Sequence, residues 1–224
     1  MAQTYLVTGA SRGLGAEFVR QLRGAGHDVI AAVRQPDAAR DATGAGARVV
    51  ALDVTKPDTF EAFAAEVARP IDVLVNNAGV AARDGSLATV SLGTFEDVFR
   101  TNVFGLALVT RALLPLLGRG SRRTIVNVSS SLGSLVNTQG GFSYAYCASK
   151  AALNLMTVYM HKELAKDGFT VVSLDPGWNR TDMGGGEAPL DPRDTVRSMV
   201  GLMGRFDRGE SGKFIGWDGQ PRAW

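Results

Sequence analysis

Short apolar runs of strand length alternate along this chain with longer stretches in which apolar residues recur at helical spacing. The helical pattern is clearest where Leu14, Phe18 and Leu22 follow one another at i, i+4 and i+8 on one face. The strand-like runs are mostly continuous rather than alternating, as is typical of a parallel sheet covered on both faces. They lie at residues 4–8, 29–33, 49–53, 73–76, 124–129, 170–174 and 213–217. This order predicts an α/β fold, a doubly wound, seven-stranded parallel sheet with right-handed crossovers.

The domain organisation follows from length and composition. The chain has 224 residues and contains no long linker, internal repeat or low-complexity tract. A glycine run, Gly184 to Gly186, lies in a loop-like region, but a boundary there would leave only about forty residues, too few for an independent core. We therefore expect one domain over residues 1–224, with a substrate loop at about 177–193 that acts as a lid.

Charge and apolarity exclude several classes of protein. The composition, 45% hydrophobic and 21% charged, is that of an ordinary globular protein, and the net charge of +2 creates no field that would attract nucleic acid or an anionic membrane. The basic cluster at 119–123 has no interleaved aromatic residues and is typical of a solvated loop. The most apolar helical stretch, 104–117, contains Thr110, Arg111 and Pro115 and is too short to span a bilayer. We expect neither nucleic acid nor a membrane as partner.

Cellular location is indicated by cysteine usage and by the first residues. Cys147 is the single cysteine, so no intramolecular disulfide can form, which suits a reducing compartment. The first residues run into a strand-like segment and show no signal peptide. The sequence predicts a cytoplasmic protein. Cys147 itself is either a reactive thiol or, as we favour, a buried inert one.

A glycine-rich turn joins the first strand to the first helix. Its sequence is Thr8-Gly9-Ala10-Ser11-Arg12-Gly13-Leu14-Gly15. Glycines let the backbone turn sharply and approach a pyrophosphate, and the helix amino terminus adds free N–H groups and a positive dipole end. The spacing G-x-x-x-G-x-G differs from the commonest dinucleotide fingerprint. A tight structural turn is the alternative, but the position between strand and helix favours dinucleotide binding.

The end of the second strand bears on which dinucleotide binds. An acidic residue there would bind the ribose hydroxyls of NAD, whereas arginine would accept a 2′-phosphate. The strand ends at Val33-Arg34, and Asp37 follows only after Pro36. Arg34 and Arg12 could clamp the phosphate from two sides with planar, bidentate donors, unless both are solvated surface arginines. We expect NADPH in preference to NADH.

Tyr146 and Lys150 are the candidate catalytic pair. Their i, i+4 spacing at the start of a helical segment places the phenol and the ammonium group on one face. A phenol with a pKa of about 10 is a weak acid at neutral pH, and a nearby cation favours its ionised form. Tyr144 has Ala148 at the same spacing and so lacks this partner. On its own the pair could equally be a helix-surface pair. Neither histidine, His27 or His161, suggests a triad or a metal site.

Taken together, these motifs resemble the short-chain dehydrogenases/reductases. The resemblance covers essentially the whole chain, and the motifs occur in the family's order. They are Gly9/Gly13/Gly15, Asn76-Asn77-Ala78-Gly79, Asn102, Ser129-Ser130-Ser131, Tyr146/Lys150 and Pro176-Gly177. Within the family the chain is similar to sniffer-type carbonyl reductases and bacterial C-factor-like proteins, as in Trp178-Asn179-Arg180-Thr181-Asp182-Met183. The resemblance implies a Rossmann fold and reduction of a ketone or aldehyde, or the reverse oxidation of an alcohol.

The resemblance also implies a catalytic tetrad. Tyr146 would donate its proton to the carbonyl oxygen, while Lys150 would lower the pKa of Tyr146 and hold the nicotinamide ribose. Ser130 would orient the carbonyl, with Ser129 and Ser131 as alternatives. Asn102, in the helix beginning near Thr94, would interrupt that helix and hold a water that relays protons to Lys150. The alternative for Asn102 is an ordinary helix residue.

The remaining cofactor contacts are carried over residue by residue. Asp53 would hydrogen-bond the adenine amino group, with Val54 against the ring. The backbone of Asn77, Ala78 and Gly79 would approach the adenosine ribose, whereas Asn76 would tie strands together. At the other end the resemblance implies a nicotinamide pocket built from Pro176, Gly177, Trp178 and Thr181, with core packing as the alternative for Trp178.

Three questions stay open. The segment 136–142 is longer than in compact family members and is expected to border the substrate pocket, so specificity cannot be borrowed from them. A dinucleotide-binding signalling protein of the C-factor type, with little or no turnover, is the alternative function. A nucleotide-sugar epimerase or dehydratase would need a larger carboxy-terminal domain. The family implies a homodimer or homotetramer, although sniffer-like members can be monomeric.

Overall fold

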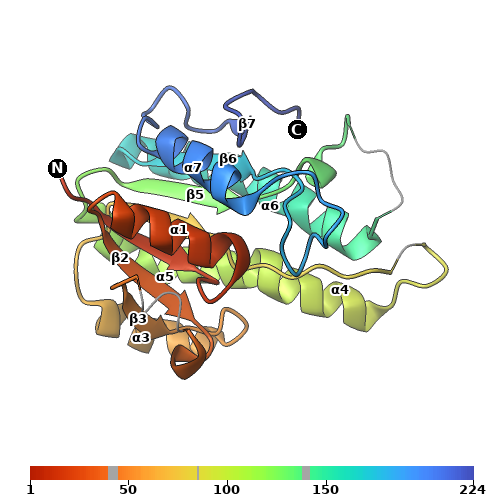
Figure 1. Ribbon diagram of the computed structural model, residues 1–224, viewed down its shortest axis with the longest axis horizontal. Coiled ribbons are helices and arrows are strands. Elements are labelled where there is room, and N and C mark those ends of the chain that lie inside the picture. The colour runs from red at the N-terminus through yellow and green to blue at the C-terminus, as the bar shows by residue number, and fades with distance from the viewer. Residues whose placement is uncertain (40–44, 85, 138–141) are drawn as a thin grey trace.

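The computed structural model describes residues 1–39, 45–84, 86–137 and 142–224, and its strands form one parallel sheet (Figure 1). The strand order is β3-β2-β1-β4-β5-β6-β7. The strands are β1 (Thr4–Thr8), β2 (Asp28–Val33), β3 (Arg48–Ala51), β4 (Val73–Asn76), β5 (Thr124–Val128), β6 (Thr170–Asp175) and β7 (Phe214–Gly216). All seven predicted strands and the doubly wound α/β fold are confirmed. The predicted pocket border at 136–142 lies largely outside the described residues.

The order of the strands reverses at β1. This strand pairs with β2 on one side and with β4 on the other, so that Val7 lies between Ala31 and Val75. The connections leaving β1 and β4 therefore run in opposite directions, and they leave a crevice at the carboxyl ends of these two strands. Such a switch point is where open α/β sheets bind their ligands.

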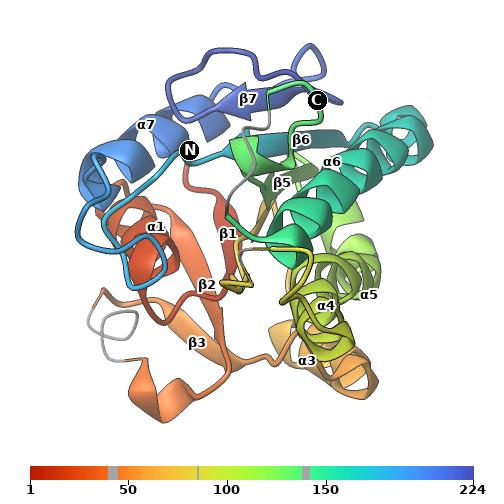
Figure 2. The same cartoon turned by 90° about the vertical axis from the view of Figure 1, so that its right-hand side faces the viewer.

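Helices cover both faces of the sheet (Figure 2). Helices α1 (Gly13–Gly24) and α7 (Pro192–Met203) lie on one face, where Phe18 and Leu22 share a buried cluster with Met199. Helices α3 (Phe60–Val67), α4 (Leu92–Phe99), α5 (Leu106–Gly118) and α6 (Tyr144–Leu164) lie on the other. The apolar face predicted from Leu14, Phe18 and Leu22 is thus the face of α1 that packs on the sheet.

One long helical rod, Leu92–Gly118, consists of α4, a π-helical segment (Arg100–Gly105) and α5. By length and composition alone it could cross a membrane, but half of its most apolar window is buried inside the protein. Val109, Leu113 and Leu117 of α5 pack with Phe63 of α3 in the second core cluster. Core packing therefore accounts for much of the apolarity of this rod.

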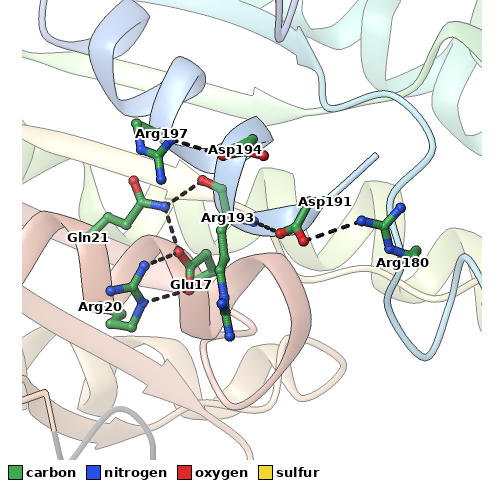
Figure 3. A network of polar contacts seen from close by, with 8 residues as sticks. All are labelled: Glu17, Arg20, Gln21, Arg180, Asp191, Arg193, Asp194 and Arg197. Carbon is green, nitrogen blue, oxygen red and sulfur yellow. Dashed lines mark hydrogen bonds and ion pairs between the residues drawn. The ribbon is translucent and has the colours of Figure 1, made fainter. Parts of the chain in front are cut away.

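The loop between β6 and α7 is held at its base by a polar network (Figure 3). Arg180 donates to the carbonyl oxygens of Ala188 and Pro189 and pairs with Asp191, which caps α7 by accepting from the Arg193 N–H. Gln21 of α1 donates to the Arg193 carbonyl oxygen at 2.8 Å. The predicted substrate loop is therefore anchored to both α7 and α1.

Candidate active site

A cleft of about 440 Å³ runs along the carboxyl ends of the strands at the switch point. Its wall contains most of the residues that the sequence predicts for cofactor binding. They are Gly9, Ser11, Arg12, Gly13, Leu14, Gly15, Arg34, Asp53, Val54, Asn77, Ala78, Gly79, Tyr146, Lys150, Pro176 and Thr181. Sequence reasoning did not include Arg83, Thr101, Asp182 and Met183, which also line the cleft. Segments far apart in the sequence thus meet at one site.

The glycine-rich turn is built so tightly that side chains are excluded from it. Gly9 has φ +65°, and a Cβ there would lie 2.8 Å from the Cα of Ala78. A Cβ on Gly15 would collide with the Gly9 carbonyl oxygen and would lie 2.6 Å from the Asn77 amide nitrogen. The Asn77 side chain holds this arrangement, because it donates to the carbonyl oxygens of Thr8 and Gly9.

The first N–H groups of α1 are left open. Within the described part of the chain, the backbone N–H groups of Gly13, Leu14 and Gly15 have no acceptor, and Arg12 caps the helix without a side-chain hydrogen bond. A helix amino terminus with open donors attracts an anion. This cradle fits the pyrophosphate of a dinucleotide.

The basic residues near the cradle are arranged differently from the two-arginine clamp that the sequence predicts. Arg34 lines the cleft and also a second hollow, together with Ser11, Gln35, Asp53 and Lys56. Arg12 instead pairs with Asp182 at 3.2 Å, which links the glycine-rich turn to the loop after β6. Lys56 was missed, although it stands only three residues after Asp53. The cations beside the end of β2 are therefore Arg34 and Lys56.

Asp53 and Val54 lie at the same end of the cleft. One carboxylate oxygen of Asp53 accepts from the N–H and the hydroxyl of Thr55, at 2.9 and 2.7 Å. Burial alone would raise the pKa of Asp53, but the Thr55 hydrogen bonds and the nearby Lys56 and Arg34 outweigh it and leave the pKa lowered. Asp53 is thus an ionised acceptor beside the buried Val54.

Tyr146 and Lys150 line the cleft, as does Ser129, whereas Ser130 lies beside Tyr146 and does not line the cleft itself. The Ser130 hydroxyl acts on the Tyr146 phenol as a hydrogen-bonding neighbour that lowers its pKa, and the Lys150 ammonium group lies 5.6 Å from the centre of the tyrosine ring. Lys150 Nζ donates to the Val128 carbonyl oxygen at 2.9 Å. Tyr146 lies in the first turn of α6, where the Ser143 hydroxyl accepts from its N–H.

Burial dominates the titration of this pair. It raises the pKa of Tyr146 to about 12, although the Ser130 hydrogen bond opposes the shift, and Asp175 and Cys147 add to it. Burial also lowers the pKa of Lys150 to about 8. The expected lowering of the Tyr146 pKa by Lys150 is therefore not what the structure shows. The desolvation of a phenolate outweighs the cation, which is itself turned toward Val128.

The three neighbouring serines are separated by their surroundings. Ser129 is buried, and its hydroxyl donates to the Asn154 side chain at 2.6 Å. Ser131 is exposed and begins a short 3₁₀ turn, Ser131–Gly133. Ser130 contacts Tyr146, so the geometry supports the choice made from the sequence.

Asn102 lies in the π-helical segment rather than in a regular helix. It is fully buried, and its side chain accepts from the Val80 N–H and donates to the Val80 carbonyl oxygen and the Ser149 hydroxyl. A Cβ on Gly79 would lie 3.4 Å from Asn102 Oδ1 and 3.8 Å from Lys150 Nζ. The predicted interruption of the helix at Asn102 is thus present, and the side chain fastens the segment after β4 to α6.

The residues predicted around the nicotinamide are only partly gathered. Pro176 and Thr181 line the cleft, and Gly177 turns behind it with φ +69°. Trp178 is 55% exposed, does not line the cleft, and donates its indole N–H to the Gly184 carbonyl oxygen. Both expectations for Trp178, pocket lining and core packing, are therefore wrong, because the loop turns its ring outward.

A comparison with known families decides the classification of this fold and cleft. The family model of short chain dehydrogenases matches residues 3–189. The chain belongs to the short-chain dehydrogenase family. The resemblance seen in the sequence is confirmed, and this short-chain dehydrogenase is an NAD(P)-dependent oxidoreductase.

Three relatives place the chain within the short-chain dehydrogenases. C-signal of Myxococcus xanthus is 42% identical over 167 residues, which are 74% of this chain and 100% of that protein. The NADPH-bound carbonyl reductase from chicken fatty liver is 31% identical with a TM-score of 0.94, over 100% of this chain and 99% of that one. The carbonyl reductase Sniffer of D. melanogaster is 29% identical with a TM-score of 0.95, over 100% of both chains. The predicted similarity to sniffer-type reductases is confirmed.

Two residues behind this short-chain dehydrogenase site were missed from the sequence. Asp175, the last residue of β6, is 4% exposed at its side chain and pairs with Arg222 at 3.1 Å. Its other oxygen accepts from the N–H groups of Ser131 and Gly177. Asp175 and Arg222 are 47 residues apart, so no local sequence pattern indicates that they pair.

Proposed function

We propose that this protein uses NADPH to reduce a ketone or an aldehyde to an alcohol, or catalyses the reverse oxidation, with Tyr146 as the proton donor. The observation that carries the proposal is that Tyr146 and Lys150 line the same cleft as an anion cradle, with Ser130 acting on the Tyr146 phenol from beside it. The carbonyl reductases among its structural neighbours support the reaction class.

Each residue has a chemical task in this scheme. When bound, NADPH supplies a hydride from C4 of the nicotinamide to the carbonyl carbon. Tyr146 gives its phenol proton to the carbonyl oxygen, so that the product is a neutral alcohol, and Ser130 orients that oxygen by a hydrogen bond. Lys150 stabilises the phenolate that remains and holds the nicotinamide ribose. Asn102 keeps Val80 and α6 in register and positions the water that returns a proton by way of Lys150.

The preference for NADPH rests on the charges at the end of β2. Arg34 is there in place of a carboxylate, and Lys56 lies beside the same hollow. The solved relative with bound NADPH supports the assignment. Asp53 and Val54 would hold the adenine, the backbone from Asn77 to Gly79 the ribose, and Pro176, Gly177 and Thr181 the nicotinamide.

The wider setting belongs to the same proposal. The substrate is a small carbonyl or alcohol compound, and the 224 residues act as one domain in the cytoplasm, a location that the single cysteine supports. Neither nucleic acid nor a membrane takes part.

Replacing the phenol tests the proposal directly. Tyr146→Phe should lower kcat for NADPH-dependent carbonyl reduction by about a hundredfold to ten-thousandfold, because the general acid is lost. NADPH affinity should change by less than about twofold, since the phenol oxygen is a small part of a long binding site. Turnover is followed by nicotinamide absorbance over a panel of ketones and aldehydes, and affinity by titration calorimetry.

Tyr144→Phe is the matched control, because Tyr144 lies on the same helix and is 49% exposed. It should retain full turnover. Unchanged kcat in Tyr146→Phe would refute the assigned proton donor.

The similarity to C-signal favours a second candidate, a dinucleotide-binding signalling protein with little turnover. Both candidates share the cradle, and the convergent Tyr146, Ser130 and Lys150 favour the enzyme. If the protein binds NADPH but no carbonyl compound in the panel oxidises it above background, the signalling function is the better account.

A further inference from the structure

Asp175 joins the two loops that flank the proposed catalytic centre. It ends β6, and one carboxylate oxygen accepts from Ser131 N–H at 3.0 Å and from Gly177 N–H at 3.1 Å. Ser131 follows Ser130 in the loop after β5, and Gly177 follows Pro176 of the cleft wall. One buried carboxylate therefore fixes the backbone on both sides of the site.

Arg222 supplies the opposite charge from the carboxy-terminal segment. Its Nε donates to the second Asp175 oxygen at 3.1 Å, and Asp218 orients the guanidinium group by a further contact at 2.9 Å. The same segment reaches the loop after β5 again, because the Trp224 carbonyl oxygen accepts from the Ser134 hydroxyl and the Leu135 N–H. Figure 2 shows the end of the chain beside this loop.

The Asp175 carboxylate lies close enough to the phenol to affect it. Asp175 acts on Tyr146 electrostatically and raises its pKa, as burial does more strongly, whereas the Ser130 hydrogen bond lowers it. Several titratable or charged groups surround Tyr146 or border its cleft and the start of its helix. Nearest to Tyr146 are Lys150 and Cys147 of α6, Arg83 and Asp84 of the segment after β4, and Asp175 of β6, while Arg12, Arg34, Asp53 and Asp182 line the rest of the cleft.

We propose that Asp175 and Arg222 form a positioning pair that holds Ser130 against Tyr146 and keeps the carboxylate charge beside the phenol balanced. The pair acts through Ser130 and the local field, and neither residue touches the reacting atoms. This inference rests on the proposed function, since it assigns Tyr146 the proton transfer. It makes the carboxy-terminal segment part of the catalytic apparatus.

The test is a set of pH profiles for alcohol oxidation. Arg222→Met leaves the Asp175 charge unbalanced, so the pH midpoint should rise by about half a unit or more, and kcat should fall by about threefold to tenfold. The KM for the cofactor should change less than about twofold, because the cradle is untouched. Arg222→Lys, which keeps the charge, should return the midpoint toward that of the unchanged protein.

A double variant separates the effect of charge on the midpoint from a purely structural effect on kcat. Asp175→Asn combined with Arg222→Met removes both charges, so the midpoint should return to the original value or fall below it. A purely structural role predicts instead that Arg222→Met and the double variant both lose kcat while the midpoint stays unmoved in each. Arg197→Met removes an arginine from an exposed pair with Asp194 and should change neither quantity.

The two proposals fail in different ways. If Tyr146→Phe abolishes turnover while Arg222→Met leaves the midpoint unmoved, the positioning pair is refuted and the proposed function stands. If Tyr146→Phe retains turnover, the proposed function is refuted, and the positioning pair, which depends on it, is refuted with it. Should Arg222→Met fail to fold, Asp175→Asn alone carries the test: it removes the negative charge that raises the pKa of Tyr146, so the midpoint should fall, and an unmoved midpoint would refute the positioning pair.

Discussion

Lys150 pairs with a neutral carbonyl rather than with an acid. Its side chain is buried, its Nζ donates to the Val128 carbonyl oxygen, and burial lowers its pKa to about 8 from 10.5. In the unfolded chain the lysine would hold its proton up to about pH 10. In the absence of the cofactor, keeping Lys150 charged in this buried site therefore lowers the free energy of unfolding.

This cost predicts an unusual pH dependence of stability. Between about pH 8 and 10 the unfolded chain binds more protons at Lys150 than the folded protein does, so the free energy of unfolding should rise with pH in this window. Above about pH 10 Tyr146 reverses the trend, because its raised pKa keeps the folded phenol protonated while the unfolded one ionises. Lys150→Met should therefore stabilise the cofactor-free protein by up to about 3 kcal/mol near pH 7, a gain that shrinks toward pH 10.

Urea unfolding at a series of pH values measures this effect. Lys162→Met is the control, because Lys162 lies exposed on the same helix and should leave the pH slope unchanged. A Lys150→Met variant that is less stable than the unchanged protein at pH 7 would contradict the prediction.

At the scale of the element, the start of α6 determines where the phenol lies. Ser143 caps this helix by accepting from the Tyr146 N–H at 3.1 Å, and Asp84 accepts from the Ala145 N–H at 3.2 Å. Ser143→Ala should cost about 1 kcal/mol of stability, the usual effect of losing an N-cap. It should also lower kcat by about tenfold, because fraying of the first turn displaces the phenol.

Ser91→Ala separates these two effects. Ser91 caps α4 in the same way, by accepting from the Thr94 N–H, but α4 carries none of the proposed catalytic groups. We expect a similar loss of stability by urea unfolding and an unchanged kcat. Equal losses of kcat in both variants would show that capping acts through global stability alone.

The sequence predicts correctly those elements that depend on the spacing of residues close together in the chain. Seven apolar runs gave the strands, the spacing of Phe18 and Leu22 gave the buried face of α1, and the i, i+4 relation brought Tyr146 and Lys150 together. The boundaries shifted by one or two residues, as when β3 ended at Ala51. Local periodicity carries no information about such ends, which depend on the neighbouring strand.

What the sequence could not predict depends on contacts between distant residues. The π-helical segment at Asn102 exists because that side chain reaches Val80 and Ser149. Arg12 pairs with Asp182, 170 positions away, and no local pattern could have shown this contact. Nor does any local pattern show which way the loop turns Trp178.

At the scale of the whole molecule, the cleft joins the two halves of the sheet. Its wall takes Arg34 from the end of β2 and Tyr146 from α6, on opposite sides of the switch point at β1. A dinucleotide that spans the cleft binds only the folded chain, so it should stabilise the fold by mass action. The gain is about 2.7 kcal/mol when the ligand is present at a hundred times its Kd.

This linkage turns cofactor preference into a difference of melting temperatures. For a chain of this size each kcal/mol shifts Tm by about 2–4 °C, so NADPH at that excess should raise Tm by about 5–10 °C, and NADH at equal concentration by clearly less. Arg34→Asp should bring the NADPH shift down to that of NADH or below it, because a carboxylate repels the 2′-phosphate and can accept from ribose hydroxyls. Lys56→Met should reduce the NADPH shift in part. Arg111→Asp makes the same change of charge at an exposed position of α5 and should preserve the NADPH shift. Equal losses of the shift for both cofactors in Arg34→Asp would mean that Arg34 does not recognise the phosphate.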